Sequence, residues 1–191
     1  GLPAPPAIAL DDVTVISIVL QQVVVGIVIG FAARLVFVGV EYGGELIGLQ
    51  MGLNYATFFD PDSGGSSAAS TRLFGTMASL LFIVINGHLL LTLAVIQSFE
   101  VFPVGTDALA LLKVLQPHTW GAEVFRLGVW IALPVVGMIL LVNLVLGVVS
   151  RVAPQMQIFA IGFPITLGVG LLGITLTLPT LQLPFTLTLE R

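Results

Sequence analysis

The sequence predicts an all-α protein whose long helical hairpins belong to a membrane complex. Its 191 residues are 57% hydrophobic and only 8% charged, whereas soluble domains are about 45–50% apolar and about 25% charged. So few charges cannot cover a water-facing surface. Four uncharged stretches, each longer than the roughly 20 residues that cross a hydrocarbon core as a helix, supply the main elements: Val13–Ala33, Leu73–Phe99, Leu127–Ser150 and Val152–Leu189.

Proline, glycine and polar residues mark the connections between these stretches. Pro3, Pro5 and Pro6 predict an extended entry to the first helix. Asp60–Ser70 is rich in turn-forming residues, and Pro103–Asp107 is a shorter turn between hydrophobic segments. We therefore expect the chain to reverse direction at these two positions.

The first helix is too long for a simple membrane span. If it ran from Val13 to about Gly52, it would be about 60 Å long, twice the thickness of a hydrocarbon core. Part of it must leave the bilayer or break. Any break is expected at Gly43-Gly44, because paired glycines each weaken a helix interior by roughly 1 kcal/mol relative to alanine. Hydropathy by itself predicts four or five transmembrane helices, which this helix fits poorly.

The C-terminal third predicts a helical hairpin. Ser150–Pro154 separates two long apolar segments so closely that we expect them to pack antiparallel. The second arm is expected to bend near Pro164. Arg151 at the corner favours the cytoplasmic side by the positive-inside bias.

A few polar residues lie inside the apolar stretches, namely Asn86, His88, Gln97 and Asn143. Facing lipid would be costly, so we expect them to point inward or toward partner subunits. For His88 we favour a hydrogen-bonded interface residue over a proton relay.

Composition and spacing exclude several functional classes. The six Lys and Arg residues are scattered singly and the net charge is −4, so no cationic surface is available for nucleic acid. The chain has no cysteine, and neither His88 nor His118 has a carboxylate in metal-binding spacing. Asp60-Pro61-Asp62 lacks the rest of a calcium loop. We predict no catalytic residues, no metal site, no cofactor and no enzyme activity.

Arg34, Glu41 and Glu45 form a polar stripe on the first helix. Their spacing places all three within about 20° of one line on an ideal helix. One interpretation is functional: the stripe is an inter-subunit salt-bridge seam or lines a water-filled vestibule. The second is that this helix face simply projects beyond the lipid into water, and the third is proton translocation through Glu41 or Glu45. Since one arginine cannot neutralise two glutamates, a seam predicts a basic group on a neighbouring chain.

A glycine stripe precedes a group of bulky apolar residues. Gly44, Gly48 and Gly52 recur every four residues, so on a helix they share one face and permit close helix packing. The stripe leads directly into Met51, Tyr55, Phe58 and Phe59. Such glycine patterns usually indicate packing alone, but a constriction of methionine and aromatic side chains can also close a pore by excluding water.

Three motifs, taken in order, resemble the FliR family, the R subunit of the flagellar type III export gate, whose injectisome counterpart is SctT. They are GELIGLQMGLxxATFxDP from Gly44, NGHL from Asn86 and RxAPQxxIFxIGFP from Arg151. Each motif is weak alone, but the ordered combination is specific and covers nearly the whole chain. Family members usually carry further hydrophobic sequence before and after this region, so we expect a partial chain, truncated at both ends.

The resemblance implies an assembly and a location. Residues 1–120 would imitate a P-type subunit with an inward plug at about residues 46–65, and residues 121–191 would form a Q-like hairpin. The chain would join P-type and Q-type subunits (FliP and FliQ) and an FlhB-like switch protein in a helical hetero-oligomeric gate. This gate would lie in the bacterial inner membrane at the flagellar basal body, in contact with membrane lipid. Exported unfolded proteins would cross through it, and the candidate seal residues would be Met51, Tyr55, Phe58 and Phe59.

The alternative from another class is an ordinary multi-spanning carrier or small-molecule channel subunit, which the composition permits equally well. Carriers tend to show paired interrupted helices in two related halves. This sequence has one strongly interrupted region. A pure assembly scaffold that lines no path is a third possibility.

Overall fold

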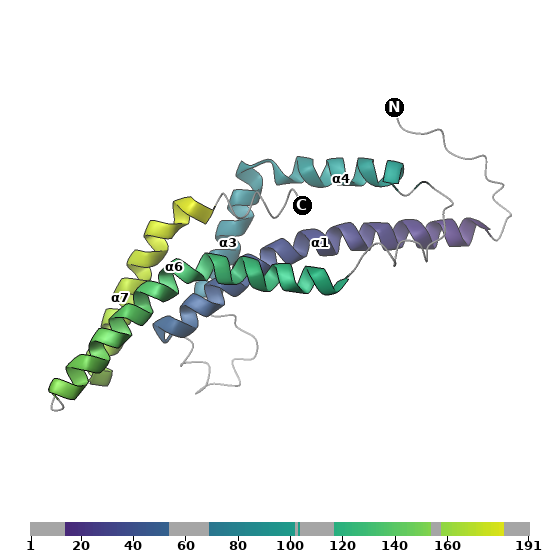
Figure 1. Ribbon diagram of the computed structural model, residues 1–191. Helices are drawn as coiled ribbons and strands as arrows, with labels where there is room; N and C mark the ends of the chain where they lie inside the picture. The colour runs from purple at the N-terminus through teal and green to yellow at the C-terminus, as the bar shows by residue number, and fades with distance from the viewer. Residues whose placement is uncertain (1–13, 54–68, 102, 104–116, 154–157, 182–191) are drawn as a thin grey trace.

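A computed structural model describes residues 14–53, 69–101, 103, 117–153 and 158–181 of the chain (Figure 1). Every element in this part is helical, which confirms the predicted all-α fold class. In chain order the elements are α1 (Thr14–Met51), α3 (Ala69–Val84), α4 (Gly87–Val101), α6 (Pro117–Val152), α7 (Ile158–Thr177) and the 3-10 helix η2 (Leu178–Leu181).

The other helices pack around α1. It contacts α6 and α3 most extensively and α4 and α7 over shorter regions, and Figure 1 shows it beside α6 in the middle of an elongated molecule. With 38 residues, α1 is about 57 Å long. It therefore exceeds the ~30 Å hydrocarbon core, as the sequence predicts.

Paired glycines do not interrupt α1. The helix is continuous through Gly43 and Gly44, the expected position of any break. A Cβ on Gly43 would lie 3.0 Å from the carbonyl oxygen of Gly128 in α6, and a Cβ on Gly44 would lie 2.8 Å from the ring of Phe74 in α3. The two neighbouring helices thus pack closely against α1 where its intrinsic helix propensity is lowest.

The apolar stretch Leu73–Phe99 is not a single straight helix. It forms α3 and α4, which are bent by 70° relative to each other. Asn86 lies between them with φ of 58°, in the left-handed region that asparagine tolerates better than most residues. Its carbonyl oxygen accepts a 2.8 Å hydrogen bond from the amide of Leu89 at the start of α4. A local backbone conformation therefore makes a corner that hydropathy does not reveal.

The two C-terminal helices form the hairpin that the short Ser150–Pro154 separation predicts. α6 and α7 pack against each other and run in opposite directions in Figure 1. Both continue through an internal proline, Pro134 in α6 and Pro164 in α7. Pro164 therefore does not divide the second arm into two elements.

Long apolar helices give the chain its membrane-protein character. Three of them are long and apolar enough to cross a membrane: Val15–Met51, Thr119–Val152 and Ile161–Thr180. The described part thus holds three candidate spans, or four if the bent α3–α4 pair is one span. Three spans would be fewer than the four or five that hydropathy predicts, and four would meet the lower bound.

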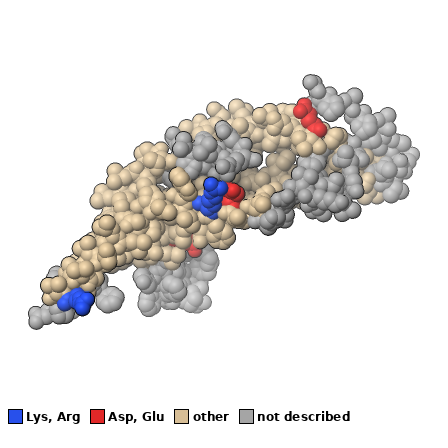
Figure 2. All heavy atoms as spheres, in the orientation of Figure 1, with Lys and Arg blue, Asp and Glu red and all other residues tan. Residues whose placement is uncertain are grey.

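The core lies where α1 meets α3, α6 and α7. Its most deeply buried large side chains include Ile47, Met51, Phe74, Val135 and Ile139. Outside this core, large hydrophobic side chains are exposed along the helices, and Figure 2 shows a surface on which charged side chains are few. An exposed apolar surface of this extent requires lipid or partner protein to cover it.

Candidate functional site

A glycine cap closes the end of α1 that leads into the predicted plug. The amide of Leu53 donates to the carbonyl oxygen of Gly48 at 3.0 Å, and the amide of Gly52 donates to that of Leu49 at 3.1 Å. These two bonds define a Schellman motif. Gly52 has φ of 81°, a conformation that glycine adopts without strain. Gly52 therefore ends the helix instead of extending the packing stripe predicted for it.

Met51, the last residue of α1, is buried inside the chain. It is 1% exposed and belongs to the hydrophobic core. It lies against Gly170 of α7, where a Cβ would meet Met51 Cγ at 2.5 Å and Sδ at 2.7 Å. In the isolated chain Met51 thus packs α1 onto α7. Its role as a seal residue stays a prediction about the assembled complex.

Most of the predicted plug, including Tyr55, Phe58 and Phe59, lies outside the described residues. Only residues 46–53 of the predicted segment 46–65 are described. They form the last turns of α1 and its glycine cap. The position from which the plug segment departs is therefore defined by the contact of Met51 with α7.

Gly44 of the stripe lies at a close helix contact. Gly44 and Gly48 are both buried. A Cβ on Gly44 would lie 2.8 Å from Cδ2 and 2.9 Å from Cβ of Phe74. Gly44 thus brings α3 close to α1, as helix-packing glycines do.

A second glycine contact, which the sequence analysis does not single out, joins α1 to α6. A Cβ on Gly128 of α6 would lie 3.0 Å from the carbonyl oxygen of Gly39 and 3.2 Å from the amide nitrogen of Gly43. The two backbones therefore touch at this crossing. The signal was present in the sequence, because Gly39 and Gly43 are also four residues apart.

The predicted polar stripe is divided in the structure. Arg34 donates hydrogen bonds from Nη1 and Nη2 to the two carboxylate oxygens of Glu41, at 3.0 and 3.1 Å, which is the bidentate geometry that arginine and carboxylate favour. The Glu41 side chain is 28% exposed and lies next to Gly75 of α3. Glu45 is exposed, and no salt bridge joins it to another residue in the described part of the chain. An inter-subunit seam here would therefore depend on Glu45.

The polar residues embedded in apolar stretches do not point inward. Asn86, His88, Gln97 and Asn143 are all exposed in the single chain. The inward half of the expectation is wrong. For His88 and Gln97 the reason is that α4 touches α1 and α3 over short regions only and so has few buried positions; Asn143 lies on an exposed face of α6. Contact of these residues with partner subunits stays a prediction.

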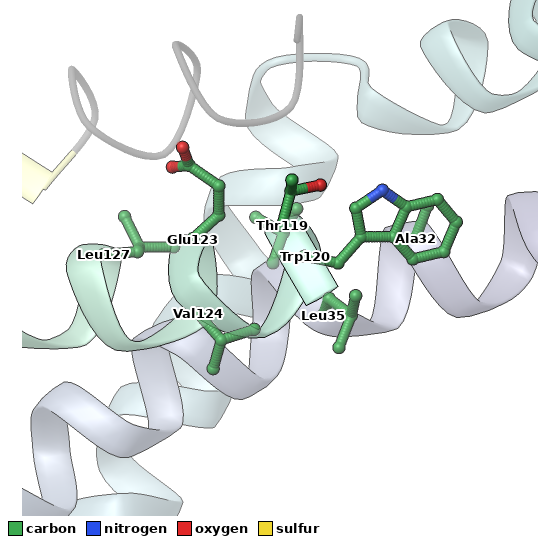
Figure 3. Close-up of a pocket in the computed structure, with 8 residues that line it drawn as sticks. Ala32, Leu35, Thr119, Trp120, Glu123, Val124 and Leu127 are labelled. Carbon is green, nitrogen blue, oxygen red and sulfur yellow. The ribbon is translucent and has the colours of Figure 1, made fainter. Parts of the chain in front are cut away.

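A pocket lies between α1 and the first turns of α6 (Figure 3). Its volume is about 380 Å³, and its lining combines five aliphatic residues with three that carry polar groups: Ala32, Leu35, Val36, Val124, Leu127, Thr119, Trp120 and Glu123. The Trp120 ring also packs against Phe31, with 6.0 Å between centroids. Periodicity within one helix cannot predict this pocket, since it depends on how α1 and α6 pair.

Charged groups are sparse around these features. Glu123 at the pocket forms an i,i+3 ion pair with Arg126 at 3.6 Å, and both side chains are substantially exposed. Among the described residues, no group of three or more His, Asp or Glu side chains is placed to hold a metal ion. The described residues thus form helix-packing surfaces, a pocket between α1 and α6, and a capped helix end.

Comparison with known proteins identifies a family across almost the whole chain. The family model described as bacterial export proteins, family 1, matches residues 2–191. The chain is 37% identical over 185 residues to the flagellar biosynthetic protein FliR of Pectobacterium carotovorum subsp. carotovorum, which covers 94% of this chain and 70% of that protein. It is 40% identical over 171 residues to FliR of Escherichia coli K12, covering 87% and 66% of the two chains. For FliR of Buchnera aphidicola from Acyrthosiphon pisum the identity is 36% over 168 residues, covering 88% and 65%.

Proposed function

The chain belongs to the FliR family of bacterial export proteins, and we propose that it is a core subunit of the flagellar type III export gate. Family membership carries this proposal. The exposed apolar surface of α1, α6 and α7 supports it, because helices of this kind must be covered by lipid or by neighbouring helices. In this role the chain would catalyse no reaction and would form part of the channel through which export substrates cross the membrane.

The proposed neighbours are the P-type and Q-type subunits FliP and FliQ and an FlhB-like switch protein, in the bacterial inner membrane at the flagellar basal body. Residues 1–120 would take the P-like position and residues 121–191 the Q-like position. The α6–α7 hairpin supports the second assignment, since it is a pair of antiparallel helices that pack against each other. Unfolded export substrates would be the cargo.

Assembly is tested by purifying the full-length protein with and without its proposed partners. We expect a complex of defined mass that contains FliP-like and FliQ-like chains, and we expect the protein alone to aggregate because its apolar helix faces are uncovered. A stable monodisperse monomer in mild detergent, with no partner in the co-expressed sample, would instead favour the carrier hypothesis.

Glu45→Leu tests the proposed seam, with Glu41→Leu as the matched variant on the same helix face. Glu41 already has Arg34 as its partner within the chain, whereas Glu45 must find a basic group elsewhere. We expect Glu45→Leu to reduce recovery of the complex and to leave ion flux unchanged. Intact assembly together with lost proton coupling would favour the relay hypothesis.

We also propose that the segment after α1 seals the resting gate through Met51, Tyr55, Phe58 and Phe59. Deletion of residues 54–58 keeps the Gly52 cap and the Met51 contact, so the complex should still form but should conduct ions. Phe58→Leu should be mild and its matched variant Phe58→Ala leakier, because a hydrophobic constriction depends on filled volume. Membrane conductance is compared at equal amounts of complex. A deletion variant that stays as tight as the parent would show that the segment only packs.

A further inference from the structure

We propose that the pocket between α1 and α6 binds an arginine or lysine side chain from a helix of a different subunit. The inference rests on the proposed function, since it requires that the chain assemble with other membrane proteins. It adds a docking position and names the chemistry of the residue that occupies it.

The interior of the pocket suits the aliphatic part of such a side chain. Its walls include Leu35 and Val36 from α1 and Val124 and Leu127 from α6. At about 380 Å³ it is within the range of about 300–1,000 Å³ of ordinary ligand pockets. Long basic side chains lay their methylene groups along apolar surface and keep the charged end at its edge.

The polar groups of the pocket favour a cation. Glu123 contributes a carboxylate and Trp120 an indole, and the described residues that line the pocket include no Lys or Arg. Figure 3 shows Glu123 and Trp120 on neighbouring turns of α6, with their side chains extending to opposite sides of Thr119. An aromatic face and a carboxylate are the two groups that a guanidinium or ammonium binds best. An anionic ligand would be repelled by Glu123.

The ion pair between Glu123 and Arg126 does not prevent this. The Glu123–Arg126 pair is 3.6 Å long, with the two side chains 45% and 63% exposed. Exposed pairs of this kind contribute little to stability. A cation that enters the less solvated pocket interacts with the same carboxylate more strongly.

The surroundings of the pocket indicate a protein helix as the source of the cation. Phe31, whose ring packs on Trp120, is 53% exposed. Exposed aromatic residues around an apolar recess are typical of protein interfaces, where arginine and aromatic side chains supply most of the binding energy. A different subunit fits better than a second copy, because this chain has only six Lys and Arg residues and a net charge of −4.

The first experiment measures association in the full-length complex. Glu123→Gln and Trp120→Leu are compared with Arg126→Gln, which removes a charge from the same turn but does not line the pocket. We expect the two pocket variants to weaken subunit association about tenfold, measured by salt-dependent co-purification, and Arg126→Gln, which removes only the exposed ion pair with Glu123, not to weaken it. If the two pocket variants associate like the parent, the docking pocket is refuted while the proposed function stands. If the unmodified protein recovers no partner, the proposed function itself fails.

The second experiment identifies the occupant without relying on a destabilising variant. A photo-cross-linking residue at Thr119, at the edge of the pocket, is activated in membranes that contain the assembled complex. We expect the cross-linked peptide to come from another subunit and to contain Arg or Lys within one helical turn of the cross-link. Cross-links to lipid, to a second copy of this chain, or to a peptide without a basic residue would overturn the inference.

Discussion

Gly44→Ala should destabilise the contact between α1 and α3, although alanine is the better helix former. The new Cβ would lie 2.8 Å from Cδ2 and 2.9 Å from both Cβ and Cγ of Phe74. Phe74 is 1% exposed in the core, and its Cβ is fixed to the α3 backbone. The ring therefore cannot move aside without moving the helix.

The magnitude follows from two opposing terms. Alanine improves helix propensity over glycine by about 1 kcal/mol, while an added methyl group in a tightly packed core costs about 1–3 kcal/mol. Gly30→Ala is the matched control, since Gly30 is also in α1 and a Cβ there would have no atom within 4 Å. The propensity term is common to both, so the variants should differ by about 1–3 kcal/mol. At about 2–4 °C per kcal/mol, the melting temperatures should differ by about 2–12 °C.

The assay is thermal unfolding of the full-length protein in mild detergent, followed by size-exclusion chromatography of the heated samples. Phe74→Leu is added to both backgrounds to complete a double-mutant cycle. The smaller leucine side chain should relieve the clash with the new methyl group. Phe74→Leu should therefore reduce the free energy of unfolding less in the Gly44→Ala background than in the parent protein. Equal melting temperatures for Gly44→Ala and Gly30→Ala, with no coupling to Phe74, would refute the close packing of α1 on α3.

Three further variants test other contacts by the same thermal assay. Gly170→Ala should lower the free energy of unfolding by about 1 kcal/mol or less, because the added methyl group meets the flexible Met51 side chain. A larger destabilisation than that of Gly44→Ala would contradict this expectation. Gly87→Ala should destabilise the α3–α4 corner, where the ring of Phe82 fills the space, and Phe82→Leu should partly restore the melting temperature; no restoration would show that the ring is not the obstacle. Glu41→Gln should cost no more than about 1 kcal/mol, because its arginine partner is 56% exposed. A greater loss would mean that the pair is desolvated.

The sequence by itself determines the helical class, the apolar lengths and the family. These properties depend on composition and on patterns within a few helical turns. The Arg34–Glu41 pair is a local property of the same kind: residues seven apart share a helix face, and the structure joins them. The hairpin at Ser150–Pro154 is also local, since a short connection between two long helices leaves an antiparallel arrangement as the accessible one.

Tertiary structure alone decides which surfaces of these helices meet. Gly44 packs against Phe74, and Gly43 packs against Gly128. Each of the two is four residues from another glycine, Gly44 from Gly48 and Gly43 from Gly39, so the spacing does not distinguish them. The burial of Met51 against Gly170 and the pocket around Trp120 likewise join segments that are far apart in the chain. A periodic pattern predicts that one face of a helix is apolar or carries small residues. Many faces of other helices could pack against such a face equally well. The choice among them is made by the shapes of all the side chains that pack together at once.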